Sequence, residues 1–339
     1  MGVVAPLIPR LGARWGRMQV ATAALLLLTM GTASRLLALQ VPVILWASAL
    51  IAGLGVAMAA GLAPSFVREW FPTRVGSVTG MYSSSMILGA AIAGATTVPL
   101  AHAFGSWPLA LAAWAVPAGV ACVIWFIVTS RQATPTPRRV PLSERSAPVS
   151  LPWRNPVALV LAAYLGCNGF VFYSLLAWMA PSYDARGWSQ VNAGYLMAVS
   201  VAVQIIGALV APRIATRLTE RRWAFAGSAV MSAVGLIVIG IFPDFLPLVW
   251  AVVAGLGLGA AFSLGLSLLS EYGETPQASA RLSALAFMVS YLCSAAGPVI
   301  MGWFIGQTGS WIGLYIVLVA ICGAQALLAW PLRRGIRIS

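Results

Sequence analysis

Two long stretches without a charged residue constrain this chain more than any other feature. Neither residues 75–130 nor residues 282–332 contain an Asp, Glu, Lys or Arg. A helix needs about 20 apolar residues to cross the hydrocarbon core of a bilayer. Each stretch is therefore long enough for two crossings, and we place the tight turns between them at 102–106 and 306–310. The chain is predicted to be an all-α, polytopic membrane protein.

The composition supports this prediction and excludes soluble classes of protein. Of the 339 residues, 60% are hydrophobic and only 8% are charged, and the mean hydropathy is +0.92. Too few polar residues remain to cover a water-facing surface, so a soluble enzyme is excluded. The net charge of +13 comes entirely from arginines. These lie in short clusters between apolar stretches, which is typical of membrane topology signals and not of a nucleic-acid-binding surface.

Cutting the chain at charges and at Pro or Gly clusters gives ten full membrane spans. The predicted spans are 18–37, 41–62, 75–100, 107–128, 157–178, 191–210, 223–242, 246–269, 282–305 and 311–330.

The arginines predict the orientation of these spans. Alternating the connections leaves only Arg35 and Arg186 on one side of the membrane and the other eighteen arginines opposite. By the positive-inside rule the crowded side is the cytoplasm. We therefore expect a protein of the inner membrane with both termini in the cytoplasm. Residues 10–32 also resemble a signal peptide, but the internal repeat explains the same residues better.

The sequence matches itself at an offset near 203 residues, which predicts two homologous halves. The first anchor is a Pro-Arg pair, Pro9-Arg10 facing Pro212-Arg213, and the others follow in the same order. They are Gly53-Leu54-Gly55 facing Gly255-Leu256-Gly257, Glu69 facing Glu271, Arg74 facing Arg281, and Gly105-Ser106-Trp107 facing Gly309-Ser310-Trp311.

This repeat also predicts the domain organisation. We expect an N-terminal bundle over 1–129, a Pro- and Arg-rich cytoplasmic linker over 130–155, and a C-terminal bundle of six spans over 156–339. The first half has four full spans, so the partners of the second half's first span and most of its second are missing. We expect a parent protein with twelve spans.

Specific residues carry a resemblance to a known family. They are Pro64, Phe71-Pro72, Thr79-Gly80-Met81-Tyr82, Pro99-Leu100-Ala101, Gly105-Ser106-Trp107, Trp114, Pro117, Tyr173, Trp178, Pro181, Ala193-Gly194, Leu282-Ser283, Tyr291, Gly297-Pro298 and Thr308-Gly309-Ser310-Trp311. With the two halves and the long central loop, they resemble the major facilitator superfamily, and within it the cyanate and nitroimidazole transporters. The resemblance implies secondary active transport, in which two helical bundles rock around a central site. The sequence departs from this branch at three polar positions: Ala60 replaces the usual Asn, and Phe287 and Asn168 each replace a usual Gln.

Polar residues inside spans are the candidates for solute binding, because polar groups are costly in a bilayer. No Asp or Glu lies mid-span. Arg35, near the outer end of the first span, can attract a small anion or simply reach the headgroups. The neutral candidates can face the solute or join helices. They are Asn168, Tyr173, Gln204, Ser290 and Tyr291.

Glu69 and Glu271 occupy equivalent places in the two halves, near loops that carry Arg14 and Arg217. We predict two ion pairs between the bundles, Arg14 with Glu69 and Arg217 with Glu271, which form and break as the cavity changes its opening. Ordinary surface ion pairs are the alternative.

No cofactor or metal site is expected. The four cysteines show no ligand spacing, and the single histidine, His102, lies in a turn. We predict a monomeric secondary transporter for a small anionic or polar organic solute, possibly coupled to protons. The alternatives are a drug efflux pump of the same fold, a membrane-integral enzyme, or an inactive shortened chain.

Overall fold

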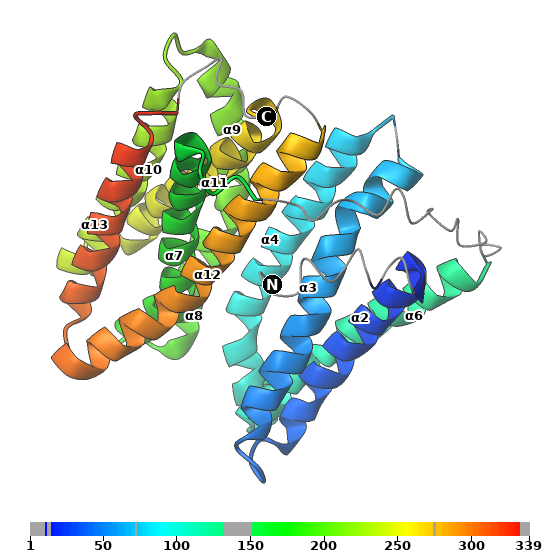
Figure 1. The fold of residues 1–339 in the computed structure, drawn as a ribbon. Helices are drawn as coiled ribbons and strands as arrows, with labels where there is room; N and C mark the ends of the chain where they lie inside the picture. Colours follow the sequence, from blue (N-terminus) through cyan, green and yellow to red (C-terminus); the bar gives the residue numbers. More distant parts are fainter. Residues whose placement is uncertain (1–10, 12–14, 72, 132–150, 274–275, 333–339) are drawn as a thin grey trace. The chain divides into compact units, whose positions relative to one another are not determined.

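The computed structural model describes residue 11 and residues 15–71, 73–131, 151–273 and 276–332 (Figure 1). These residues form helices joined by turns and contain no β-strand. Ten of the helical segments within them are long and apolar enough to cross a membrane. They coincide with the ten predicted spans, so the sequence-based prediction of an all-α polytopic protein is confirmed.

By their internal contacts, the residues fall into two compact units. The N-terminal unit comprises Met1–Ser83 and Thr96–Pro148, and the C-terminal unit comprises Ser84–Ala95 and Val149–Ser339. The predicted linker over 130–155 lies mostly outside the described residues. The boundaries predicted from the repeat therefore stay a prediction.

The N-terminal part of the chain supplies four of the ten spans. Its elements are α2 (Arg17–Ala33), the 3-10 helix η1 (Ser34–Leu37), α3 (Ile44–Trp70), α4 (Val75–Phe104), α5 (Trp107–Ala113) and α6 (Ala115–Arg131). Helix α2 packs against α3 and α6. At Gly55 of α3, an added Cβ would overlap the backbone of Leu28 and Ala24 on α2. The glycine is thus needed for the close approach of these two helices.

The C-terminal part supplies the remaining six spans. Its elements are α7 (Pro156–Asp184), α8 (Gln190–Ala202), α9 (Gln204–Arg217), α10 (Arg222–Ile241), α11 (Pro247–Glu271), α12 (Pro276–Thr308) and α13 (Trp311–Leu328). Helices α8 and α9 together form one span, Gln190–Arg217, which is interrupted near its middle. The most extensive contact joins α7 and α12, which lie side by side in Figure 1.

Local sequence signals explain where several helices begin and end. The Asn155 side chain accepts hydrogen bonds from the backbone amides of Val157 and Ala158 at 3.0 and 3.1 Å, so it caps the start of α7. Gly105 and Gly309 occupy equivalent positions in the repeat and have φ of 61° and 63°. Glycine takes this left-handed conformation without steric cost. Both predicted turns are therefore built in the same way.

Candidate functional site

Most of the buried polar side chains lie in the C-terminal unit, and all of them are uncharged. Buried serine, asparagine and glutamine side chains lie on α7, α8, α9, α10, α12 and α13. Among the described residues, no group of three or more His, Cys, Asp or Glu side chains could hold a metal ion. The polar side chains buried inside this unit are therefore neutral hydrogen-bonding groups.

Asn168 on α7 joins two helices. The Gln325 side chain on α13 donates hydrogen bonds to Asn168 Oδ1 at 3.4 Å and to the Tyr164 carbonyl at 3.3 Å. Gln325 is fully buried, and its Oε1 atom has no hydrogen-bond partner. Sequence reasoning missed Gln325, although an amide in the middle of an apolar span is the signal that singled out Asn168.

Ser290 on α12 also takes part in helix packing, whereas the ring contact of its neighbour Tyr291 lies within α12. Ser290 Oγ donates to the Leu165 carbonyl on α7 at 3.1 Å, and a Cβ at Gly169 would overlap the Ser294 hydroxyl. The Tyr291 ring stacks on Phe287 with centroids 6.0 Å apart. For Ser290, the contacts match the helix-joining role that the sequence left open as an alternative.

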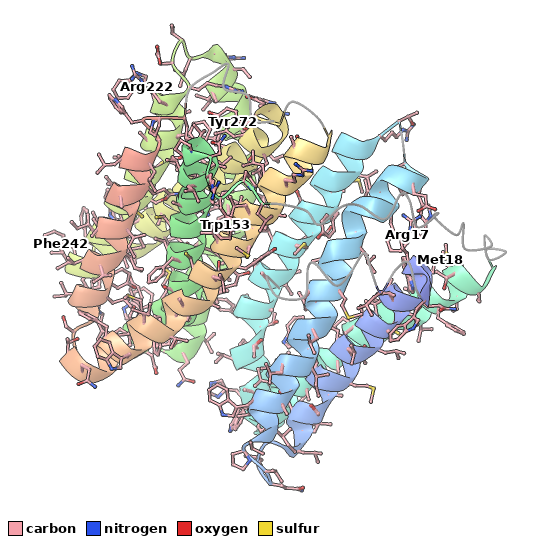
Figure 2. All side chains as sticks on the ribbon, viewed as in Figure 1. Arg17, Met18, Trp153, Arg222, Phe242 and Tyr272 are labelled. Atoms are coloured by element: carbon pink, nitrogen blue, oxygen red, sulfur yellow. The ribbon has the colours of Figure 1, made fainter. Side chains whose placement is uncertain are left out.

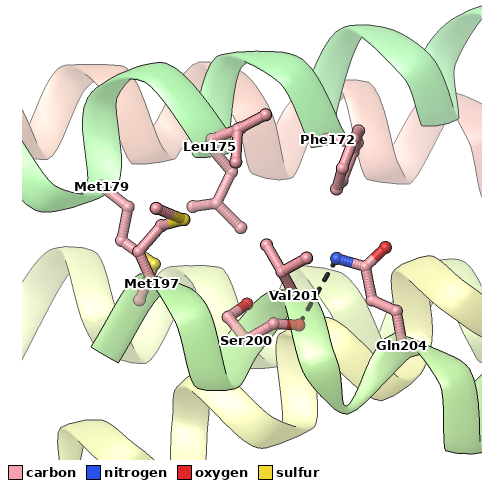
Figure 3. Close-up of a pocket in the computed structure, with 8 residues that line it drawn as sticks. Phe172, Leu175, Met179, Met197, Ser200, Val201 and Gln204 are labelled. Carbon is pink, nitrogen blue, oxygen red and sulfur yellow. Dashed lines mark hydrogen bonds between the residues drawn. The ribbon is translucent and has the colours of Figure 1, made fainter. Parts of the chain in front are cut away.

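Tyr173 on α7 is half exposed, at 39%, and its ring contacts Phe172 edge-on with centroids 5.0 Å apart. Phe172 in turn lines a small pocket between α7 and the interrupted span α8–α9 (Figure 3). Gln204, the first residue of α9, lines the same pocket. Of the predicted site residues, Gln204 therefore lines this pocket, and Tyr173 contacts it only through Phe172. Asn168, Ser290 and Tyr291 do not line the pocket.

The pocket is mainly apolar. Its empty volume is about 180 Å³, part of which is open to the surroundings. The lining residues are Phe172, Leu175, Leu176, Met179, Met197, Ser200, Val201 and Gln204. Gln204 donates from its side-chain amide to the Ser200 carbonyl at 3.4 Å, the contact that is dashed in Figure 3. No charged side chain lines the pocket.

Arg35 and Arg186, the two arginines that the sequence sets apart, differ in their surroundings. Arg186 donates to the Ile239 and Gly240 carbonyls at 3.1 and 3.2 Å and so caps the end of α10. Its guanidinium also lies 5.7 Å from the Tyr315 ring centroid. Arg35 lies in η1, is half-buried, and forms no ion pair with a described residue.

The ion pairs differ from the predicted ones in their partners. Glu69 pairs with Arg17 at 3.0 Å, and Glu271 pairs with Arg221; Figure 2 labels Arg17 at the start of α2. The predicted partner Arg217 ends α9 and is exposed, and no ion pair joins it to a described residue. Arg221 directly precedes α10, which packs on α11, so it lies nearer to Glu271.

Each observed pair lies within a single unit, and ion pairs between the bundles stay a prediction. Arg17 and Glu69 belong to the N-terminal unit, and Arg221 and Glu271 belong to the C-terminal unit. The predicted partner Arg14 lies outside the described residues. The arginines are 204 residues apart and the glutamates 202, so the two pairs are equivalent in the repeat. Sequence reasoning missed Arg17 and Arg221, although the offset relates them.

The Arg221–Glu271 pair changes the electrostatics at this end of α10 and α11. The hydrogen bond that Arg221 donates to Glu271 raises the pKa of the Arg221 guanidinium, so this arginine stays charged. Next to it, Tyr272 is buried, and burial with the nearby Glu271 charge raises the pKa of its phenol to about 12. Figure 2 labels Tyr272 and Arg222, the first residue of α10.

Comparison with known proteins identifies the family. The model of the Major Facilitator Superfamily matches residues 1–298 and again 184–337. The chain is 30% identical to a 2-nitroimidazole transporter of Escherichia coli (strain K12), over 96% of this chain and 82% of that protein. It is 31% identical to the cyanate transport protein CynX of the same organism, over 86% of this chain and 73% of that protein.

A solved structure supports the fold independently. The crystal structure of a D-xylose–proton symporter matches with a TM-score of 0.73 at 16% identity, over 99% of this chain and 86% of that one. An uncharacterized transporter of Bacillus subtilis (strain 168) is 28% identical over 94% of this chain. The chain belongs to the Major Facilitator Superfamily and is therefore a multi-pass secondary transporter of small solutes, not an enzyme.

Proposed function

We propose that this transporter moves a small organic solute, anionic or polar and uncharged, across the inner membrane by alternating access. Two relatives that match most of the chain are named for 2-nitroimidazole and for cyanate, which are both small. The observation that carries the proposal is the neutral set of buried polar side chains in the C-terminal unit. Such groups bind a solute by hydrogen bonds and do not require a charged one.

Arg35 is the proposed contact for an anionic solute. A guanidinium supplies a permanent positive charge and paired donors, and the Arg35 side chain forms no ion pair with a described residue. Asn168, Tyr173, Gln204, Ser290 and Tyr291 stay candidates for neutral contacts. Among these, Gln204 has the strongest support because it lines the pocket.

Orientation, coupling and assembly complete the proposal. The eighteen arginines on one side support cytoplasmic termini. No carboxylate lies mid-span, so a coupled proton would have to use a group other than a mid-span acid of this chain. We propose that the protein works as a monomer, because in this superfamily fold the central site is built within one chain.

The test is uptake into proteoliposomes of purified protein, with labelled cyanate and labelled 2-nitroimidazole, each with and without a proton gradient. We expect uptake of at least one solute, and the Arg35→Gln variant should lose cyanate uptake while it keeps 2-nitroimidazole uptake. Arg217→Gln, which removes an exposed arginine without a described ion pair, is the matched control. Unchanged cyanate kinetics in Arg35→Gln would remove Arg35 from the site.

Two outcomes would favour the alternatives. Transport only of large apolar drugs, and only outward, would favour an efflux pump. Absence of uptake for both solutes from protein that is folded and inserted would favour an inactive protein.

A further inference from the structure

The interruption of the span Gln190–Arg217 is the strongest unexplained feature of the C-terminal unit. Helix α8 ends at Ala202 and α9 begins at Gln204, near the middle of the span. Around it, the Ile206 and Gly207 amides both bond to the Val203 carbonyl, at 3.0 and 3.3 Å. Where the regular backbone hydrogen bonds of a membrane helix are interrupted, the backbone polar groups that are left need other partners. In transporters, interrupted helices often provide such groups to a solute or an ion.

Side chains and a neighbouring helix support the break. The Gln204 side chain bonds the Ser200 carbonyl, whose α-helical partner would be the Gln204 backbone amide. A Cβ at Gly255 of α11 would overlap the Ser200 carbonyl, and one at Gly259 would overlap the Gln204 backbone. Helix α11 therefore presses directly on the interruption, where only glycine fits. The break is a packed feature of the bundle.

An unsatisfied hydroxyl lies at this interruption. Ser200 is 1% exposed, and its Oγ atom has no hydrogen-bond partner. It lines the pocket between α7 and α8–α9, where Figure 3 shows it beside Val201 and Met197. A buried hydroxyl without a partner costs about 1–3 kcal/mol. This cost is offset when a bound molecule accepts a hydrogen bond from the hydroxyl.

We propose that Ser200 and Gln204 form a hydrogen-bonding subsite that selects solutes bearing a neutral acceptor oxygen, such as a nitro or carbonyl group. The inference rests on the proposed function and adds a specificity-determining residue, Ser200, to it. The Ser200 hydroxyl donates to the acceptor oxygen, and the second N–H of the Gln204 amide is available for the same oxygen. The start of α9 contributes the positive end of a helix dipole.

The shape and lining of the pocket limit which group can enter it. The pocket is narrow and partly open to its surroundings, so it admits a single small group such as the acceptor oxygen. Phe172, Leu175, Met179 and Met197 supply apolar lining around that group. No cation lines the pocket, so a full negative charge gains less here than at a site such as Arg35.

Binding to purified protein tests the subsite separately from transport. Isothermal titration would compare 1-methyl-2-nitroimidazole with 1-methylimidazole, the same ring without the acceptor group, at pH 8. We expect wild type to prefer the nitro compound. Ser200→Ala should weaken nitro binding about threefold to tenfold, the loss expected for one hydrogen bond, and leave the other ring unaffected. Gln204→Met should weaken nitro binding in the same direction.

Ser174→Ala is the matched control. Ser174 on α7 is also fully buried with an unpaired hydroxyl but does not line the pocket. Neither serine variant should lower the unfolding temperature, because neither hydroxyl has a protein partner to lose. Equal binding by Ser200→Ala, Ser174→Ala and wild type, or no nitro preference in wild type, would overturn the subsite. Binding without uptake would instead contradict the proposed function alone.

Discussion

The arginine–glutamate pairs of the two units occupy the same repeat position but have different surroundings. In the N-terminal unit, Arg17 and Glu69 are both about half exposed, at 49% and 42%. In the C-terminal unit, only 15% of the Arg221 side chain is exposed. The residue after the glutamate is Trp70 in one unit and the buried Tyr272 in the other. Glu271 is 41% exposed, much like Glu69, so the two pairs keep the same charges and differ in the burial of the arginine. We expect the pair with the more buried arginine to interact more strongly.

The aromatic side chains near the two ion pairs also differ. In the N-terminal unit, Trp70 stacks on Trp125 with centroids 5.6 Å apart. In the C-terminal unit, the Arg222 guanidinium lies 4.6 Å from the centroid of the Trp330 ring. The first cluster is held by apolar contact, and the second adds a cation over a ring. We therefore expect changes of charge to affect stability more strongly near the Arg221–Glu271 pair of the C-terminal unit than near the Arg17–Glu69 pair.

The largest difference is expected at high pH. The raised pKa of Tyr272, about 12, favours the neutral phenol in the folded state. This stabilisation is fully present below the unfolded pKa near 10 and is lost as the pH rises towards 12. Wild type should therefore lose on the order of 2 kcal/mol relative to Tyr272→Phe across this range. Thermal unfolding of both proteins in detergent at pH 9, 10, 11 and 12 measures this loss, and parallel curves would disprove it.

Removing the arginines should give the next largest effect. Arg221→Gln leaves Glu271 without its partner beside buried Tyr272, and we expect a cost of about 1–2 kcal/mol. Arg17→Gln breaks the exposed pair and should cost about 0–1 kcal/mol. Unfolding temperatures at low and high salt distinguish them, with the exposed Arg217→Gln as the control. If both variants lose the same stability, burial of the arginine does not change how much each ion pair contributes to stability.

The smallest effect on stability is expected from reversing the exposed pair. Arg17→Glu with Glu69→Arg should restore nearly all the stability that either single reversal loses, since these losses are small. Transport is the more informative measurement, because a gating role requires the pair to form and break during the cycle. A double reversal that transports no better than the single ones would show that this pair has no gating role.

Several features of this protein could be predicted from the sequence because they depend on local patterns. The stretches 75–130 and 282–332 determined four spans and their turns, since no charge can lie in the hydrocarbon core without cost. The repeat placed Gly105 and Gly309 in equivalent turns, which both take a left-handed conformation. The family followed from residues spread over both halves.

Only the tertiary structure decided which side chains meet. Asn168, a solute candidate by its position in a span, is bonded to Gln325, which lies 157 residues further along the chain. Glu271 pairs with Arg221 and not with Arg217, because the packing of α10 on α11 sets the distance. The unsatisfied Ser200 hydroxyl is visible only when its surroundings are known. Hydrophobic patterning is a property of single segments, whereas hydrogen bonds and ion pairs need atoms within a few ångströms, and only helix packing brings them there.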